Sequence, residues 1–208
     1  MMRTKRTRDS DRSKQEILQA AEHQFGEKGF YGARIDEIAR LSGLNKNMIY
    51  HYFDSKENLY LTVLADMYRR LEEQEQYIIS RNLHGQQLIQ ALISSYFDFL
   101  SANPYFVSLL MNENLLQGKF MKQLPRSQVQ RKTLDGIAQL IQESCDSGVF
   151  RRDIDVKQTV LTLNAICFSN FSNRYTFSQM IGYEMDNEIM ALRKQQTIDI
   201  MLSYLMKS

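Results

Sequence analysis

The most constraining feature of this 208-residue chain is a pair of short apolar patterns on either side of Gly43. Ile35 and Ile38 recur at a spacing that places both side chains on one face of a helix. Gly43 follows where that helix should end, because glycine adopts the positive φ that a sharp reversal needs. Beyond the turn, Ile49 and Phe53 repeat the helical spacing. The stretch therefore predicts two short helices joined by a tight turn.

The second helix is predicted to begin after Asn45, whose side chain can accept a hydrogen bond from the free backbone N–H groups of the first turn. With Ile49 and Phe53 turned inward, six side chains remain for the surface: Lys46, Asn47, Met48, Tyr50, His51 and Tyr52. The second helix of such a pair fits the major groove of DNA, with its N-terminal residues facing base edges. Short helix pairs joined at glycine also occur in ordinary bundles, so the pattern alone leaves both interpretations open.

The residues from Tyr50 onward favour the DNA-binding interpretation over an ordinary helix pair. The string from Tyr50 to Leu59 reads Tyr-His-Tyr-Phe-Asp-Ser-Lys-Glu-Asn-Leu. It resembles the signature of the TetR (tetracycline-repressor-like) family of bacterial transcriptional regulators, in which a recognition helix ends in Tyr-x-Tyr/His-Phe and Ser-Lys-Glu opens a long fourth helix. Over residues 14 to 64, the core and turn positions of the family also match: Phe25, Gly29, Phe30, Gly32, Ile35, Ile38, Ala39, Gly43 and Leu44.

The resemblance implies a DNA-binding surface on this segment. Lys46, Asn47 and Met48 are expected at base edges, with Tyr50, Tyr52 and Lys56 mostly on phosphates. Arg34, Asn45 and His51 complete the expected surface. His51 could donate to a phosphate, and the free N–H groups at the start of the fourth helix could also meet one.

Two departures from the family pattern affect this surface. The family usually carries Thr near positions 33 and 34, where it caps the second helix and touches a phosphate. Here Ala33 and Arg34 stand instead, so the cap is lost although Arg34 can still reach a phosphate. Asn47 occupies a position where the family often has glycine, and its amide can pair with an adenine edge. The operator preference therefore cannot be copied from a relative.

Composition and periodicity favour an all-α fold of about nine helices. The chain has only two prolines and nine glycines, and no strand-length alternating run. We expect a basic flexible arm at 1–13, a helix-turn-helix DNA-binding domain at 14–53, and a helical effector-binding and dimerisation domain at 54–208, of which 54–81 is a linking helix. The arm could touch DNA phosphates or the minor groove, or remain a solvated tail.

Capping patterns refine some boundaries of these helices. Ser13 with Glu16 predicts the start of the first helix, and Asp54 with Glu57 predicts the start of the fourth. The stretch from Tyr175 to Asp186 is expected to be irregular.

Several function classes lack their sequence signals. The net charge is only +2, and no apolar run approaches the roughly 18 residues needed to span a bilayer. Cys145 and Cys167 are far apart, and the three histidines lack metal-ligand spacing, so no metal or cofactor is expected. No phosphate loop or nucleophile motif occurs, and carboxylates such as Glu75 are expected on solvated helix faces. We expect a cytoplasmic protein that is not an enzyme.

The body is rich in aromatic residues and methionine, which suits a pocket for an apolar or planar molecule. The candidate lining, for which ordinary bundle core is the alternative, is Met67, Tyr68, Tyr96, Phe97, Met111, Leu115, Phe168 and Phe171. The resemblance also implies that the last two helices pair in a homodimer. Candidate interface positions, for which intramolecular core is the alternative, are Ile166, Phe168, Asn170, Ile198 and Leu202.

The resulting prediction is a ligand-responsive, DNA-binding transcriptional regulator of the TetR type, most often a repressor. It would bind a palindromic operator on double-stranded DNA as a homodimer, and a small molecule in its C-terminal domain would release or modulate it. The alternative is a DNA-bound interaction protein whose body binds a protein partner and no small-molecule effector.

Overall fold

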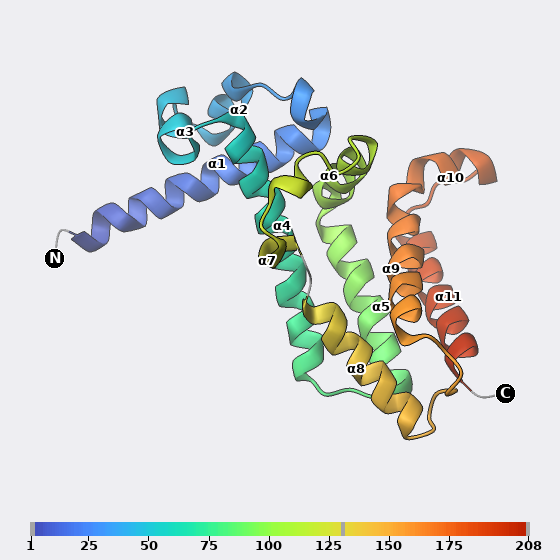
Figure 1. The fold of residues 1–208 in the computed structure, drawn as a ribbon. Coiled ribbons are helices and arrows are strands. Elements are labelled where there is room, and N and C mark those ends of the chain that lie inside the picture. Colours follow the sequence, from blue (N-terminus) through green and yellow to red (C-terminus); the bar gives the residue numbers. More distant parts are fainter. Residues whose placement is uncertain (1–2, 130–131, 207–208) are drawn as a thin grey trace. The chain divides into compact units, whose positions relative to one another are not determined.

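The computed structural model describes residues 3–129 and 132–206 (Figure 1). The regular structure in these ranges is helical, apart from one isolated bridge between Phe150 and Met206, and short turns and loops join the helices. The predicted all-α class is confirmed, with eleven α-helices in the described ranges against about nine expected. The elements are α1 (Arg3–Gly32), α2 (Ile35–Ser42), α3 (Lys46–Phe53), α4 (Lys56–Ser80), α5 (Gly85–Ala102), α6 (Pro104–Leu115), the 3-10 turn η1 (Met121–Gln123), α7 (Arg126–Val129), α8 (Lys132–Asp146), α9 (Val156–Ser172), α10 (Arg174–Ile181) and α11 (Asn187–Leu205).

Helix α1 begins earlier than its capping pattern predicts. It starts at Arg3, so Ser13 lies inside the helix and does not cap it. Neither Pro nor Gly interrupts the chain between Arg3 and Phe25, and Arg12 Nε donates to Glu16 Oε1 at 2.9 Å one turn further on. Most of the expected arm is therefore helical, while residues 1 and 2 lie outside the described residues.

Helix α10 occupies part of the stretch that is expected to be irregular. It spans Arg174–Ile181 and ends at Gly182, which takes a left-handed conformation with φ 80°. The hydroxyl of Ser178 accepts a hydrogen bond from the backbone N–H of Met185 at 3.0 Å, which fixes the turn after the helix. The periodicity failed here because the large apolar side chains of α10 are mostly exposed and mark no core face.

By its internal contacts the chain divides into two compact units. Unit 1 combines Met1–Arg69 with Pro104–Val129, and unit 2 combines Arg70–Asn103 with Gln130–Ser208. Unit 1 thus contains the helices of the expected head together with the first half of α4 and the segment from α6 to α7.

An aromatic cluster forms the core of unit 1. The Tyr60 ring on α4 lies edge-on to Phe25 and Phe30 of α1, with centroid distances of 4.9 and 5.2 Å. Phe120, which follows α6, completes the cluster at 4.9 Å from Tyr60 and 4.3 Å from Phe30. Rings in such tilted contacts stabilise one another beyond the area they bury. This cluster explains why the segment after α6 belongs to the same unit as α1.

Helix α6 packs directly on α1. A Cβ at Gly26 would overlap the ring of Tyr105, so only glycine allows this close approach. The Tyr105 ring also lies 5.1 Å from the ring of His23. Three residues beyond Gly26, Gly29 takes φ 65° and bends α1 before the chain reaches α2.

Helix α5 is the centre of unit 2. Its side chains are buried over most of its circumference, as its sequence predicts for a helix inside a bundle. It packs against α8, α9 and α11. The buried positions are Gly85, Leu88, Ile89, Leu92, Ile93, Tyr96, Phe97, Phe99 and Leu100.

Candidate DNA-binding surface

Helices α2 and α3 form the predicted helix-turn-helix. The turn between them contains Gly43 with φ 69°, and its N–H bonds back to the end of α2. Asn45 caps α3, because its side-chain oxygen accepts from the backbone N–H of Met48 at 3.0 Å. Ile49 and Phe53 are buried, as their spacing predicts. The remaining side chains of α3 are therefore held on its outer side by a capped and anchored helix.

The exposed side chains of α3 are those that could meet DNA. Lys46, Asn47, Tyr50 and His51 are exposed, whereas Met48 is half-buried. Lys46 pairs with Asp36 of α2, an ion pair on the surface that contributes little to stability. A phosphate or a guanine edge could therefore replace Asp36 as the partner of Lys46 at small cost.

Tyr52, at the end of α3, is positioned by α1. It is half-buried, and Lys14 Nζ lies 5.5 Å from the centroid of its ring. The ring of His51 is tilted against it at 5.2 Å.

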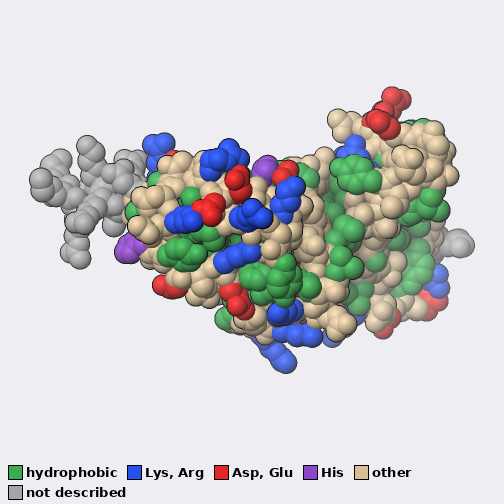
Figure 2. Space-filling view, turned by 90° about the horizontal axis from the view of Figure 1, so that it is seen from above, with side chains coloured by type: hydrophobic (Ala, Val, Ile, Leu, Met, Phe, Trp, Pro, Cys, Tyr) green, Lys and Arg blue, Asp and Glu red, His purple; other side chains and the backbone are tan. Residues whose placement is uncertain are grey.

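Figure 2 shows Lys and Arg side chains interspersed with Asp and Glu on the face drawn, so that basic side chains occur in small groups there.

Helix α2 lacks a side-chain cap, as the sequence predicts from the loss of threonine. Arg34 occupies the N-cap position with extended backbone, and its side chain makes no capping hydrogen bond. The preceding Ala33 is buried, whereas Arg34 is exposed. The exposed guanidinium is therefore free of a capping role and could reach a phosphate.

Lys56 has an internal role that the sequence does not reveal. Its ammonium donates to the backbone oxygen of Ala33 at 2.6 Å and lies 4.8 Å from the centroid of the Phe30 ring. Burial lowers the pKa of Lys56 from its ordinary value. Lys56 thus ties the start of α4 to the end of α1, and the other N–H bonds of its ammonium could serve a phosphate.

The start of α4 differs from the predicted capping box. Ser55 caps the helix, with its hydroxyl accepting from the N–H of Asn58 at 3.0 Å. Asp54 lies one residue earlier with φ 61° and ψ −44°. The Asp54–Glu57 spacing therefore gave the wrong capping residue, because Ser55 offers an equally good acceptor one position closer to the helix.

The eight residues expected to line an effector pocket divide between the two units. In unit 1, Met67 is buried, and the Tyr68 hydroxyl donates to Met121 Sδ at 3.5 Å. Met111 and Leu115 are 40% and 81% exposed, so the surrounding helices do not enclose them. In unit 2, the rings of Phe97 and Phe171 meet at 5.3 Å. Tyr96 is buried and Phe168 is half-buried.

A buried polar cluster in unit 2 was not predicted from the sequence. The carboxyl group of Glu75 on α4 contacts the hydroxyls of Tyr96 on α5 and Thr133 on α8. Glu75 is only 3% exposed, which corrects its expected place on a solvated face. Burial raises its pKa to about 7, opposed by the Thr133 hydrogen bond and assisted by the charge of Glu72. A cavity of about 10 Å³ beside it has room for at most one water molecule.

The expected dimer positions fall into two groups. Asn170 and Ile198 are buried within unit 2 of the single chain, and Asn170 Oδ1 accepts from Arg193 Nε at 2.8 Å. Ile166, Phe168 and Leu202 are half-buried. Large apolar side chains that sequence reasoning missed are exposed on α9 and α11: Leu161, Leu192, Ile200 and Tyr204.

Metal-binding and membrane-spanning features were also sought. Among residues 3–129 and 132–206, no group of three or more His, Cys, Asp or Glu side chains is placed to hold a metal ion. In the same ranges, no helix is long and apolar enough to cross a membrane. Cys145 and Cys167 are both buried free thiols, and burial raises the pKa of each.

Comparison with known proteins covers both the head and the body. The family described as "Bacterial regulatory proteins, tetR family" matches residues 17–63, and "Tetracyclin repressor-like, C-terminal domain" matches residues 86–201. The chain is similar to the HTH-type transcriptional repressor NicS of Pseudomonas putida, with 31% identity over 181 residues, 86% of this chain and 85% of that protein.

Solved structures share the fold. The putative transcriptional regulator SCO4942 from Streptomyces coelicolor superposes with a TM-score of 0.68 at 20% identity, over 93% of this chain and 98% of that one. The regulator FadR from Bacillus subtilis, solved in complex with stearoyl-CoA, superposes with a TM-score of 0.64 at 18% identity, over 91% and 98%. At such identities the likeness establishes the fold alone.

Proposed function

Because the chain belongs to the TetR family of bacterial DNA-binding transcriptional regulators, we propose that it is a ligand-responsive repressor that binds a palindromic operator as a homodimer. The observation that carries this proposal is the outer side of α3, where Lys46 and Asn47 are exposed at the start of a helix capped by Asn45. Such a helix end can enter the major groove.

The proposed contacts divide into two kinds. Lys46, Asn47 and Met48 read base edges, and Asn47 is suited to an adenine because its amide offers a donor and an acceptor together. Phosphates are held by a second set, which fixes the position of the helix in the groove: Arg34, Asn45, Tyr50, His51, Tyr52 and Lys56.

A dimer is needed because one head covers too little DNA for selective binding. Two heads about 34 Å apart on a two-fold axis can read both halves of a palindrome. The exposed Leu161, Leu192, Ile200 and Tyr204 on α9 and α11 support this, since apolar side chains of that size favour burial against a second copy. The half-buried Ile166, Phe168 and Leu202 would border the interface.

The effector site is proposed within residues 54–208. The contact between the rings of Phe97 and Phe171 in unit 2 supports an apolar or planar ligand. FadR, which shares this fold, was solved with stearoyl-CoA, and this supports a body that holds a small molecule. The effector must bind better when the heads have one particular spacing, because a ligand with equal affinity for both states shifts nothing. The site of action is the bacterial cytoplasm.

A second candidate function is a DNA-bound protein whose body binds a protein partner. It draws support from α10, where Tyr175 and Met180 are about four-fifths exposed. Both candidates require the dimer, so the dimer is the property to test first.

The test is sedimentation of the purified full chain, alone and with an operator duplex. We expect a particle of twice the 24.5-kDa chain mass, and one such particle on each duplex. Leu192→Asp with Ile200→Asp should give monomers that lose selective binding, whereas the control Gln195→Asp, at an exposed position of the same helix, should stay dimeric. Selective binding by a monomer would contradict the proposal.

A further inference from the structure

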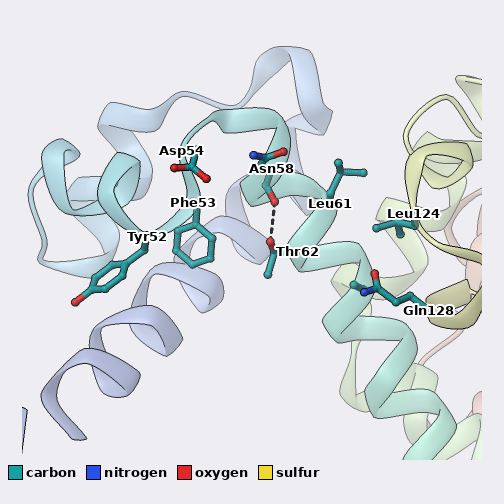
Figure 3. Close-up of a pocket in the computed structure, with 9 residues that line it drawn as sticks. Tyr52, Phe53, Asp54, Asn58, Leu61, Thr62, Leu124 and Gln128 are labelled. Carbon is teal, nitrogen blue, oxygen red and sulfur yellow. Dashed lines mark hydrogen bonds between the residues drawn. The ribbon is translucent and has the colours of Figure 1, made fainter. Parts of the chain in front are cut away.

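A surface hollow of about 390 Å³ lies within unit 1, beside the end of the recognition helix. Figure 3 shows its walls: the end of α3, the first turns of α4, and the segment around α7. Leu61 of α4 and Leu124, which precedes α7, supply apolar surface, and Phe53 supplies an aromatic ring. Its volume falls within the range of small-molecule sites, and five of its nine lining residues carry a polar group. Its lining shares no residue with the eight residues expected to line the effector pocket.

Asp54 at the rim of the hollow has a strained backbone. Its φ of 61° and ψ of −44° accompany a hydrogen bond of 2.6 Å from the N–H of Ser55 to the oxygen of Phe53. This is the γ-turn of positive φ, which is rare and strained in L-residues. Strain of this kind persists at sites where a side chain must be held in a given place. The turn presents the Asp54 carboxylate at the rim of the hollow.

The Asp54 carboxylate is also unpaired. Within residues 3–129 and 132–206 it makes no hydrogen bond and no ion pair, and it is exposed. None of the nine residues that line the hollow is Lys or Arg. The other polar groups of the lining are the amides of Asn58 and Gln128 and the hydroxyls of Tyr52 and Thr62, and each can accept a hydrogen bond from a ligand. The hollow thus combines a single negative charge with neutral acceptors.

The ring of Tyr52 already makes a cation–π contact within unit 1. Lys14 Nζ lies 5.5 Å from its centroid, in an adjoining hollow of about 380 Å³ that shares Tyr52, Phe53 and Thr62 with the first. The contact shows that the Tyr52 ring can bind an ammonium group. The preference of the first hollow for a cation rests on the Asp54 carboxylate, because Lys14 would repel a second ammonium at the same ring.

We propose that this hollow binds a small amphipathic organic cation, such as an arylalkylammonium ion. Its charged nitrogen would meet the Asp54 carboxylate, and its apolar part would lie along Phe53, Leu61 and Leu124. N–H groups of the ligand would donate to Asn58 or Gln128. Because Tyr52 also belongs to the proposed DNA-binding surface, an occupied hollow should lower the affinity of the head for DNA.

The test uses the full chain with ¹³C-labelled leucine methyl groups and no DNA, so its outcome does not depend on the proposed repressor function. The probes are benzylammonium, benzyl alcohol and benzoate. We expect benzylammonium to shift the Leu61 and Leu124 signals saturably, with an affinity about tenfold higher than that of benzyl alcohol, and benzoate to leave them unmoved. The signals of Leu100 and Leu205, buried in unit 2, should not move.

Two variants test whether the Asp54 carboxylate causes the preference for a cation. Asp54→Asn keeps the shape and tolerates positive φ, and it should remove the tenfold preference for benzylammonium over benzyl alcohol. Asp199→Asn, an exposed carboxylate on α11, should leave that preference unchanged. The proposal is overturned if no probe shifts Leu61 and Leu124, if the three probes bind alike, or if Asp54→Asn keeps the preference.

Discussion

The hydroxyl of Tyr60 on α4 donates a hydrogen bond of 3.0 Å to Oε1 of Glu113 on α6, and both side chains are buried. The other carboxylate oxygen accepts from the backbone N–H groups of Phe120 at 3.2 Å and Met121 at 3.0 Å. Three donors therefore satisfy a charge that would otherwise be costly to bury. This one side chain joins α4, α6 and the segment that carries Phe120 within unit 1.

Removing Glu113 should destabilise unit 1 strongly. Glu113→Ala leaves three buried donors without an acceptor and should lower the free energy of unfolding by about 3 kcal/mol. Glu113→Gln keeps one acceptor oxygen and should cost less. Urea denaturation measures both, with the exposed neighbour Asn114→Ala expected to stay within about 0.5 kcal/mol of the parent. A loss below that level in Glu113→Ala would refute the role given to this carboxylate.

Asp54→Gly should stabilise the protein. Glycine reaches the φ of 61° found at this position without a Cβ penalty, so the change should raise the free energy of unfolding by about 1 kcal/mol. Asn82 also has positive φ, at 49°, but asparagine tolerates that region. Asn82→Gly should therefore raise the free energy of unfolding by less than Asp54→Gly does. Thermal unfolding of both variants makes the comparison. If Asp54→Gly lowers the melting temperature, Asp54 is not strained.

Much of the head could be predicted because its signals are local. The Gly43 turn, the Asn45 cap and the inward Ile49 and Phe53 all depend on residues within a few positions of each other. The γ-turn at Asp54 could not be predicted, because both Asp54 and Ser55 fit a capping pattern and only the path of the backbone decides between them.

The polar sites of the two units could not be predicted, for a different reason. Tyr60 and Glu113 are 53 positions apart, and Glu75 and Thr133 are 58 positions apart, so no local spacing links them. Glu75 lies among other acidic residues of α4, which favoured a solvated face. Only the packing of α5 and α8 against α4 buries it.

Asn47→Ala should weaken operator binding and relax specificity. The loss of an amide paired with a base edge should cost about 1–3 kcal/mol on the selected site and much less on a scrambled duplex. Fluorescence anisotropy with both duplexes measures the difference, and the exposed Asn187→Ala on α11 is the control. Equal weakening on both duplexes would mean that Asn47 does not read a base.

Lys56→Ala should weaken all duplexes alike. If its ammonium holds a phosphate, the slope of log affinity against log salt concentration should become shallower by about one. The variant also loses the hydrogen bond to Ala33, so its folding must be checked by urea denaturation before binding is compared. Lys157→Ala, an exposed lysine on α9, should leave the slope unchanged. An unchanged slope in a folded Lys56→Ala variant would confine Lys56 to its internal role.

Glu75 should make the stability depend on pH. Its pKa in the folded protein is about 7, above its ordinary value of 4.5. Between these values the folded state keeps a proton that the unfolded state loses, so the contribution of Glu75 to stability falls as pH rises from about 4.5 to about 7 and is level above. The full change is on the order of 3 kcal/mol.

Glu75→Gln cannot ionise and should lack this pH dependence, so its free energy of unfolding should rise relative to that of the parent between pH 5 and pH 7. Urea denaturation at several pH values makes the comparison, with the exposed Glu188→Gln as a control that should follow the parent. A constant difference between Glu75→Gln and the parent across this range would show that Glu75 does not titrate there.

The central claim is that α3 reads a palindromic operator from a dimer, and selection of binding sites from a random duplex pool tests it most directly. Purified full-length protein should enrich a palindrome whose half-sites lie about one helical turn apart, with affinity that falls steeply as salt concentration rises. Recovery of no enriched sequence, with only weak and salt-sensitive binding, would contradict the account.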